Sequence, residues 1–408
     1  MANRWRKPVK LAVVILMVFP FLAGCWDRLE IEDRAVVLGV SIDEAKKVTE
    51  EQEESEVIPN GPKTDMVHVA VQIALPGRIP LGPSDSGGGG GAGSQETLWV
   101  IDVIGHSIDD ALMNLQQQIS GRLFFGHLRV IVVSEKIARR GLENVNDFFR
   151  RNSEVRRMAW LLISKGNARK LMTAAPKLER VPTLYLMATL DEGIKMGKFP
   201  KDYIGIFWSN AVKKGQEGFL PYVELRKEDN VEISGLAIFK DKKMVGRTKA
   251  LDIGAYMAIK GSNPAGYRVF VDLGGPKKNV MTSTTHRDEK TRISFKNGYP
   301  HFDVYMTIEI NLEEKISDSV MISTTGTLKQ VEETEKKMAL KIYRDTIEMT
   351  QAQGADIFGF GELIRAKRPS YWNRKIRTKA NWQEMYKEKA TFDFHLTVKA
   401  RRIGMRAK

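Results

Sequence analysis

The chain contains very little cysteine and little histidine. Of its 408 residues, one is cysteine, Cys25, and six are histidine. One thiol can form neither an internal disulfide nor a site with several cysteine ligands, so the fold must be stabilised by packing. After Cys25, no apolar run reaches the roughly 20 residues with which a helix crosses a bilayer. The sequence therefore predicts that the body of the protein lies outside the membrane.

Sequence patterns of known catalytic sites are also missing. No histidine pairs with another histidine or with a carboxylate at the helix-turn spacing of a zinc peptidase, and neither G-x-S-x-G nor a phosphate-binding G-x-x-x-x-G-K loop occurs. His127, beside Phe125 and Gly126 at the start of an expected strand, is the most unusual histidine, but one histidine makes no site. We expect no enzyme activity, no metal and no cofactor.

Residues 1–24 have the form of a secretion signal. A basic head precedes the apolar run from Leu11 to Phe21, which is too short for a comfortable permanent span. Leu22, Ala23 and Gly24 form a lipobox ahead of Cys25. Ala23 and Gly24 are small enough for the Gly24–Cys25 bond to enter the active site of a signal peptidase. We expect a diacylglyceryl lipid on Cys25, which would hold the mature chain on a membrane surface. The alternative is that Cys25 is a small buried residue of an uncleaved anchor.

The charge of the chain is strongly positive. The formal net charge is +14, and because residues 1–24 carry four basic and no acidic side chains, the remaining 384 residues keep +10. Outside a membrane, this charge suits anionic lipid headgroups, acidic wall polymers or acidic faces of partner proteins. Nucleic acid is not an expected partner.

Apolar periodicity predicts an α+β fold of three domains, with mixed or antiparallel sheets packed by helices. In an N-terminal α/β domain, residues 25–200, strands alternate with helices that we expect on one face of the sheet. The best helix signal there begins at its cap, Ser107. A small β-rich domain, residues 201–264, contains a hairpin.

The C-terminal domain, residues 265–408, is expected to combine alternating strands with one long charged helix. Strands are predicted at Val280–Ser283 and Thr291–Phe295, among others, and the helix covers Leu328–Gln353. A final strand, Thr391–Lys399, places apolar residues at every second position, as a strand with one buried face requires.

The segment from Asp356 to Lys379 is a candidate contact surface. Two phenylalanines alternate with glycines at its start, and seven basic residues lie from Arg365 to Lys379 with no acid among them. Aromatic and arginine side chains together are typical of interface hot spots. The residues expected to bind an acidic protein surface or anionic headgroups are Phe358, Phe360, Trp372, Arg374, Lys375 and Arg377. Alternatively, the two phenylalanines pack beneath the preceding helix and the charges solvate a loop.

Several ordered motifs resemble one protein family over nearly the whole chain. They are Gly24-Cys25-Trp26-Asp27, Phe124-Phe125-Gly126-His127-Leu128-Arg129, Asp147-Phe148-Phe149-Arg150, Ser234 to Lys240, and Asp356 to Gly361 followed by Pro369 and Trp372. Together they resemble the C-subunit lipoproteins of the spore germinant receptors, the Ger(x)C family. The departures are small: Ser41 stands where glycine is usual, and Ile357 where the family often has proline.

The resemblance implies a three-domain α+β body on the outer face of the spore inner membrane. It also implies A-type and B-type membrane subunits as partners, a role in germination in response to nutrients, and no catalytic role. From the residues we expect no small-molecule ligand for the isolated chain. Two other functions stay open on the residues alone: a solute-binding lipoprotein that feeds a transporter, and a wall-associated hydrolase that uses two carboxylates.

Overall fold

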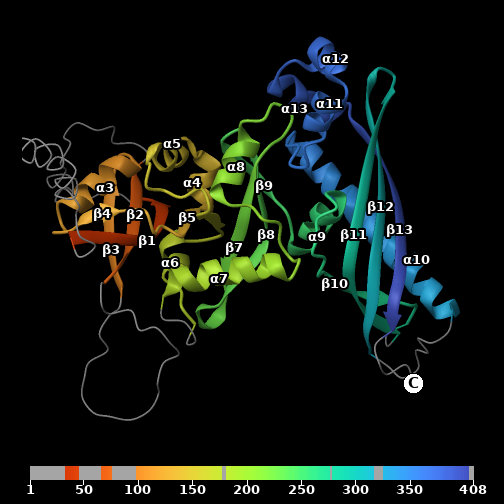
Figure 1. Ribbon diagram of the computed structural model, residues 1–408, viewed down its shortest axis with the longest axis horizontal. Coiled ribbons are helices and arrows are strands. Elements are labelled where there is room, and N and C mark those ends of the chain that lie inside the picture. The colour runs from red at the N-terminus through yellow and green to blue at the C-terminus, as the bar shows by residue number, and fades with distance from the viewer. Residues whose placement is uncertain are drawn as a thin grey trace, which may run out of the picture.

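Two β-sheets organise the protein, a large one in the N-terminal part and a narrow one in the C-terminal part (Figure 1). We call the large sheet with its helices the first lobe, and the narrow sheet with its helices the second lobe. The computed structural model describes residues 33–45, 66–75, 98–176, 181–275, 278–316 and 325–403. The expected lipobox, Leu22 to Gly24, and Cys25 lie outside the described residues. Within the described part of the chain, no helix is long and apolar enough to cross a membrane.

The large sheet is mixed. In spatial order its strands are β3 (Leu98–Gly105), β2 (Val67–Ala74), β1 (Arg34–Glu44), β5 (Val130–Ser134), β6 (Trp160–Ser164), β7 (Phe219–Leu225), β8 (Val231–Lys240) and β9 (Lys243–Arg247), and the short β4 (Arg122–Phe124) also pairs with β1. Strands β1, β5, β6 and β7 run parallel, whereas the pairs toward both edges are antiparallel. The central strands β5 and β6 are buried at every residue, as parallel strands covered on both faces usually are.

Helices cover both faces of this sheet, not one face as the sequence suggested. One buried cluster takes in side chains of α3 (Ile108–Gln116), α4 (Glu135–Arg140), α5 (Glu143–Arg151) and α8 (Ile204–Ala211). A second takes in α6 (Ala168–Met172), α7 (Pro182–Lys195) and α9 (Ala250–Ile259). The continuous apolar runs of β5 and β6 explain the two layers, since both faces of those strands need cover. The expected cap of α3 is confirmed, because Ser107 Oγ accepts a hydrogen bond from the Asp110 amide at 3.2 Å.

Strands assigned to the small middle domain continue the sheet of the first domain. The expected hairpin is present as β8 and β9. However, β7 pairs in parallel with β6 at Ile163 and Tyr222, so residues on both sides of position 200 share one sheet. The division at residue 200 stays a prediction, because a shared sheet does not decide which segments fold as units.

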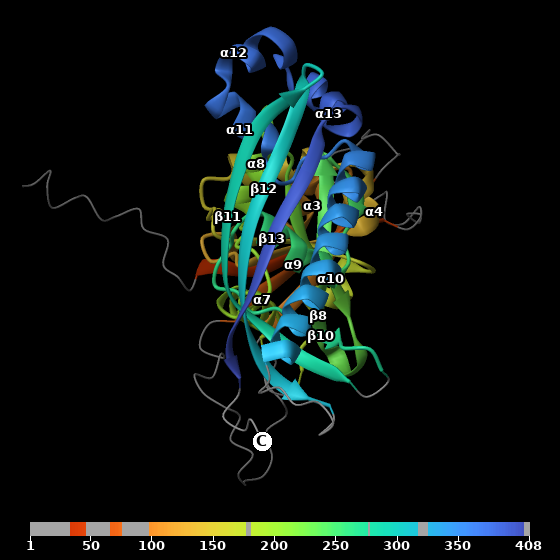
Figure 2. The same ribbon diagram turned by 90° about the vertical axis from the view of Figure 1, so that its right-hand side faces the viewer.

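The narrow sheet is a long twisted ribbon (Figure 2). Its order is β10 (Arg268–Asp272), β11 (Asn279–Lys296), β12 (Tyr299–Lys315) and β13 (Thr391–Ile403), antiparallel except for the β12–β13 pair. The two strands expected at Val280–Ser283 and Thr291–Phe295 are wrong as separate elements, since β11 runs through both. The polar residues between them pair with β12 all the same, because backbone pairing does not require apolar side chains.

The turn of this hairpin is visible in the sequence as Asn297-Gly298. Both residues have positive φ, 53° and 81°, which is the backbone of a tight two-residue hairpin turn. Helix α10 (Thr325–Gln353) packs along the ribbon and buries Val331, Tyr343 and Ile347, so the expected long helix is confirmed.

Short helices form a cap at one end of the ribbon. They are α11 (Phe360–Lys367), α12 (Pro369–Tyr371), the π-helical turn η3 (Trp372–Ile376) and α13 (Lys379–Glu388), and one further 3₁₀ turn, η2 (Lys227–Asp229), lies in the first lobe. This cap meets the loop before β7. Gly215 N donates to Glu362 Oε1 at 2.8 Å, and Glu217 N donates to the Asp356 carbonyl at 2.8 Å. We call this contact between residues 215–217 and 356–362 the seam.

Candidate functional site

The three aromatic residues expected to contact a partner lie in the core. Phe358, Phe360 and Trp372 are 2%, 4% and 3% exposed. The Phe358 ring lies 5.4 Å from that of Tyr256, and the Phe360 ring lies 4.8 Å from that of Phe302. Core packing, the alternative that the sequence left open, accounts for the positions of these three rings. A role in partner binding stays a prediction that would require them to leave the core.

Asp356 builds the turn that carries both phenylalanines. Its Oδ1 accepts from the Gly359 amide at 2.8 Å, and its Oδ2 accepts from the Gly361 amide at 2.9 Å and from Trp382 Nε1 at 3.0 Å. Burial raises the pKa of this carboxyl to about 7, although the three donors favour the charged form. Gly359 has φ +80°, a conformation that glycine adopts without strain. The segment is therefore an ordered turn held by one buried side chain.

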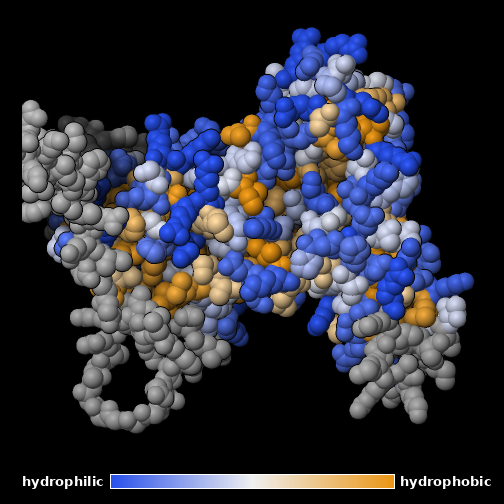
Figure 3. Space-filling view, viewed as in Figure 1, coloured by the Kyte–Doolittle hydropathy of each residue, from blue (hydrophilic) through white to orange (hydrophobic). Residues whose placement is uncertain are grey.

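The basic residues of the same segment are at the surface. Arg374, Lys375 and Arg377, which we call the basic triad, are exposed on and beside η3. Figure 3 shows hydrophilic side chains gathered over this end of the molecule. Among the described residues, the structure gives the triad no ion pair. The triad was expected on a loop, but Arg374 and Lys375 lie on the helical turn η3, and Arg377 follows it with a φ of 67°. Pro369 stands in the first turn of α12, where no amide donor is needed.

Lys379, the last basic residue of the run, faces inward. Its Nζ lies 2.8 Å from Glu217 Oε2 and donates to the Ala211 carbonyl at 2.9 Å. Glu217 is buried, and burial raises its pKa while Lys379 and Gln383 act in the opposite direction. Six of the seven basic residues of the run are thus exposed, and the seventh, Lys379, contacts the first lobe.

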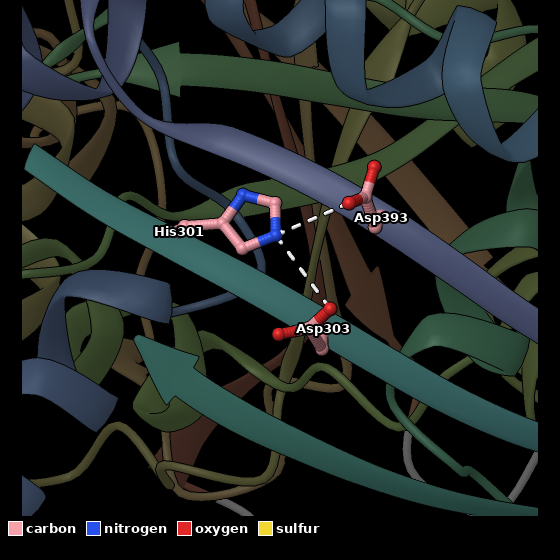
Figure 4. A group of neighbouring side chains, drawn as sticks. All are labelled: His301, Asp303 and Asp393. Carbon is pink, nitrogen blue, oxygen red and sulfur yellow. Dashed lines mark ion pairs between the residues drawn. The ribbon is translucent and has the colours of Figure 1, made fainter. Parts of the chain in front are cut away.

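A second group of polar side chains lies on the outer face of the ribbon (Figure 4). The parallel register of β12 and β13 sets Asp303 opposite Asp393 and His301 opposite Thr391. His301 Nε2 is 3.2 Å from Asp393 Oδ2 and 3.6 Å from Asp303 Oδ1. These three residues could hold a metal ion, because their ligand atoms all lie within 4.8 Å of one another.

Two neighbours complete the surroundings of this cluster. His395, two residues after Asp393, places its Nε2 at 3.3 Å from Asp303 Oδ1. Lys296 Nζ lies 3.3 Å from Asp393 Oδ2, and its hydrogen bond and charge lower the pKa of that carboxyl. We call His301, Asp303, Asp393 and His395 the ribbon cluster.

Sequence reasoning missed the ribbon cluster because it tested histidines at helix-turn spacing. The ligand pairs are instead H-x-D and D-x-H, at the period of two that puts side chains on one face of a strand. The two pairs lie about 90 residues apart, and only the β12–β13 pairing brings them together. His127, the histidine that the sequence singled out, lies with its ring 5.9 Å from that of Phe124.

An apolar pocket of about 350 Å³ lies between α9, β10 and α10. Three of its lining residues are polar and almost fully buried: Arg287, Glu335 and Tyr343. Arg287 donates to the Ser262 carbonyl at 3.1 Å, whereas Glu335 Oε2 has no hydrogen-bond partner. Burial raises the pKa of Glu335 to about 7. This carboxyl is a destabilising feature of the second lobe at neutral pH.

Both lobes match models of spore germination proteins. Residues 27–225 match the spore germination protein N-terminal domain, and residues 234–404 match the spore germination B3/GerAC-like C-terminal domain. The fold and its two matched halves thus place the protein in the class of spore germination proteins. Within that class, the chain belongs to the Ger(x)C family.

Individual relatives span almost the whole chain. A relative named for spore germination, YfkR of Bacillus subtilis (strain 168), is 29% identical over 394 residues, 94% of each chain. Spore germination protein KC of the same organism is 25% identical, over 97% of this chain and 96% of its own. The crystal structure of the GerBC protein aligns with a TM-score of 0.54 at 18% identity, and covers 89% of this chain and 96% of that one. This likeness confirms the expected α+β fold class.

Proposed function

We propose that the chain is the lipid-anchored, non-catalytic C subunit of a nutrient germinant receptor, on the outer face of the spore inner membrane. The observation that carries the proposal is the extent of the family match. It begins at residue 27, two residues after Cys25, and takes in both lobes. The part of the chain that follows the expected lipid anchor is therefore of the spore germination type throughout.

The proposed anchor is a lipid on Cys25. Each buried methylene contributes about 0.8 kcal/mol, so two acyl chains hold a protein at a membrane far more firmly than its basic residues, each worth about 1 kcal/mol near anionic lipid. The net positive charge of the body supports the same location but does not replace the lipid. The proposed partners are an A-type and a B-type membrane subunit.

Co-purification from spore membranes tests the anchor and the partners together. The native chain should stay in the membrane after a high-salt wash and bring both subunits with it. Cys25→Ser should be released by salt and should reduce the germination response to nutrients. Full retention of Cys25→Ser after the wash would show that something other than lipid holds the protein, and absence of both subunits from the native sample would remove the receptor role.

We also propose that the isolated chain binds no germinant amino acid or sugar tightly. A solute-binding lipoprotein would have two similar α/β lobes around a cleft, but the two described lobes differ: one is a mixed sheet covered on both faces, and the other is a ribbon with one long helix. Calorimetry of residues 26–408 against common germinants checks this. Micromolar binding would favour the solute-binding function.

A further inference from the structure

The β12–β13 register places two negative charges directly opposite each other. Asp303 and Asp393 are paired residues on neighbouring strands. Like charges in this position repel and destabilise strand pairing. Lys296 forms an ion pair with Asp393. Arg292 pairs with Asp303 across β11 and β12, but its guanidinium lies over the Tyr305 ring, and among the described residues the structure gives Asp303 no ion pair with a lysine or arginine. A cation between the two carboxylates would remove the repulsion from both.

His301 is aimed between these carboxylates without a hydrogen bond to either. The side chain is 2% exposed, and its Nε2 has no hydrogen-bond partner. Its distances of 3.2 and 3.6 Å to Asp393 Oδ2 and Asp303 Oδ1 exceed the roughly 2.7–2.9 Å of a charge-assisted hydrogen bond. A buried polar atom without a hydrogen-bond partner is costly, and so calls for another kind of partner.

The distances agree with the edges of a metal-centred tetrahedron. Zinc bonds to histidine nitrogen and carboxylate oxygen are about 2.0–2.2 Å long, which sets neighbouring ligand atoms about 3.3–3.6 Å apart in a tetrahedron. Three of the six distances between ligand atoms of the ribbon cluster are 3.2, 3.6 and 3.3 Å, the last between His395 Nε2 and Asp303 Oδ1. The ligand atoms of His301, Asp303 and Asp393 all lie within 4.8 Å of one another, so little movement brings these three around one ion. His395, whose Nε2 is near Asp303 Oδ1, must turn towards the other two residues to become the fourth ligand.

The other ring nitrogen of His301 has the partner that a metal ligand needs. Nδ1 lies 2.7 Å from Thr391 Oγ1. When Nδ1 carries the proton and donates it to this hydroxyl, the lone pair of Nε2 is left for an ion. In ligating histidines the nitrogen that does not bind the metal usually donates a hydrogen bond in this way. Asp393 and His395 are 57% and 47% exposed, so an ion can enter from solvent.

We infer that His301, Asp303, Asp393 and His395 bind one divalent transition-metal ion of the zinc class, which joins strands β12 and β13. Two imidazoles and two carboxylates suit zinc, whereas calcium and magnesium prefer oxygen ligands alone. The ion would hold the start of β13, where the chain returns from α13, against β12. This site goes beyond the proposed function and does not depend on it.

Zinc titration of the full chain, purified in detergent without a polyhistidine tag and stripped with EDTA, tests the site. We expect one Zn²⁺ per chain, a rise in melting temperature on binding, and visible absorption typical of tetrahedral Co²⁺ when Co²⁺ is used as the probe. Ca²⁺ and Mg²⁺ should bind more weakly. A chain that binds no Zn²⁺, or that binds Ca²⁺ in preference to it, would overturn the inference.

Variants at the exposed ligands assign the ion to this cluster. Asp393→Asn and His395→Ala should fold, because both side chains are largely exposed, and each should weaken Zn²⁺ binding at least about tenfold. Lys296→Met should strengthen it, because the ammonium group competes for Asp393 Oδ2. The matched control is His68→Ala, which removes a histidine 3.3 Å from Asp102 in the other sheet and should leave the affinity unchanged. Native affinity in both ligand variants would overturn the assignment.

Discussion

Glu335 offers a direct test of the energetics of the second lobe. This residue of α10 is 7% exposed in the apolar pocket beside β10, and its Oε2 has no hydrogen-bond partner. Burial raises its pKa from the ordinary 4.5 to about 7, and a hydrogen bond from Thr282 offsets only part of that rise. Glutamine has nearly the same shape, keeps an oxygen for Thr282 and cannot ionise. We therefore expect Glu335→Gln to stabilise the protein at alkaline pH.

The sign and size of the effect follow from the two pKa values. The folded state retains the proton of Glu335 up to about pH 7, whereas the unfolded chain loses it near pH 4.5. The stability that Glu335 contributes is therefore fully present below pH 4.5 and is lost as the pH rises through 7. At about 1.4 kcal/mol per pKa unit, the carboxylate costs about 3 kcal/mol at pH 8 and less than about 1 kcal/mol at pH 5.

Denaturant unfolding of the native chain and of Glu335→Gln at both pH values measures this difference. We expect the variant to gain about 3 kcal/mol at pH 8 and little at pH 5. The control is Glu333→Gln on the same helix, whose side chain is 64% exposed, and which should change stability by less than about 0.5 kcal/mol at either pH. An equal gain at both pH values, or a loss at pH 8, would refute the reasoning.

Two further predictions concern the basic triad and the seam. Replacing the basic triad by glutamate should leave the melting temperature unchanged and reduce co-purification with the membrane subunits. The control replaces Lys337, Lys341 and Arg344 on α10, which are also exposed, and should not reduce co-purification. Unchanged assembly in the triad variant would discard this interface, and lost stability would make its charges structural. Gly215→Ala should lower the free energy of unfolding by about 1–3 kcal/mol, because the added Cβ would lie 2.3 Å from the Gly361 carbonyl carbon. The control is Gly166→Ala, where an added Cβ meets nothing within 4 Å, and it should leave the free energy of unfolding unchanged. Equal stability of the two variants would contradict the close approach at the seam.

Elements with a strong period could be predicted from the sequence. Helix α10 and strand β13 each carry apolar residues on one face, and the structure buries those faces against each other. β11 was predicted as two strands because its middle, from Thr284 to Lys290, is polar. That stretch is paired by its backbone to β12, and a side-chain pattern carries no signal for such pairing.

The surroundings of single residues could not be predicted in the same way. The sequence left Phe358 and Phe360 open as interface or core, because the rings that cover them, Tyr256 and Phe302, come from distant segments. The ribbon cluster likewise depends on a strand pairing between residues about 90 positions apart. Local periodicity fixes which face of an element is apolar, but it does not say which other element meets that face.

The seam connects the exposed basic triad to the first lobe through very few residues. Arg377 is followed two positions later by Lys379, whose ammonium group contacts the buried Glu217 next to the start of β7. Gln383 Nε2 of α13 donates to the same carboxyl group, at Oε1, at 2.6 Å. Because Glu217 N also binds the carbonyl of Asp356, the turn that carries Phe358 and the helix that follows the triad are held by one residue of the first lobe. A partner that docks on the triad therefore acts within a few residues of the contact that sets the two lobes against each other.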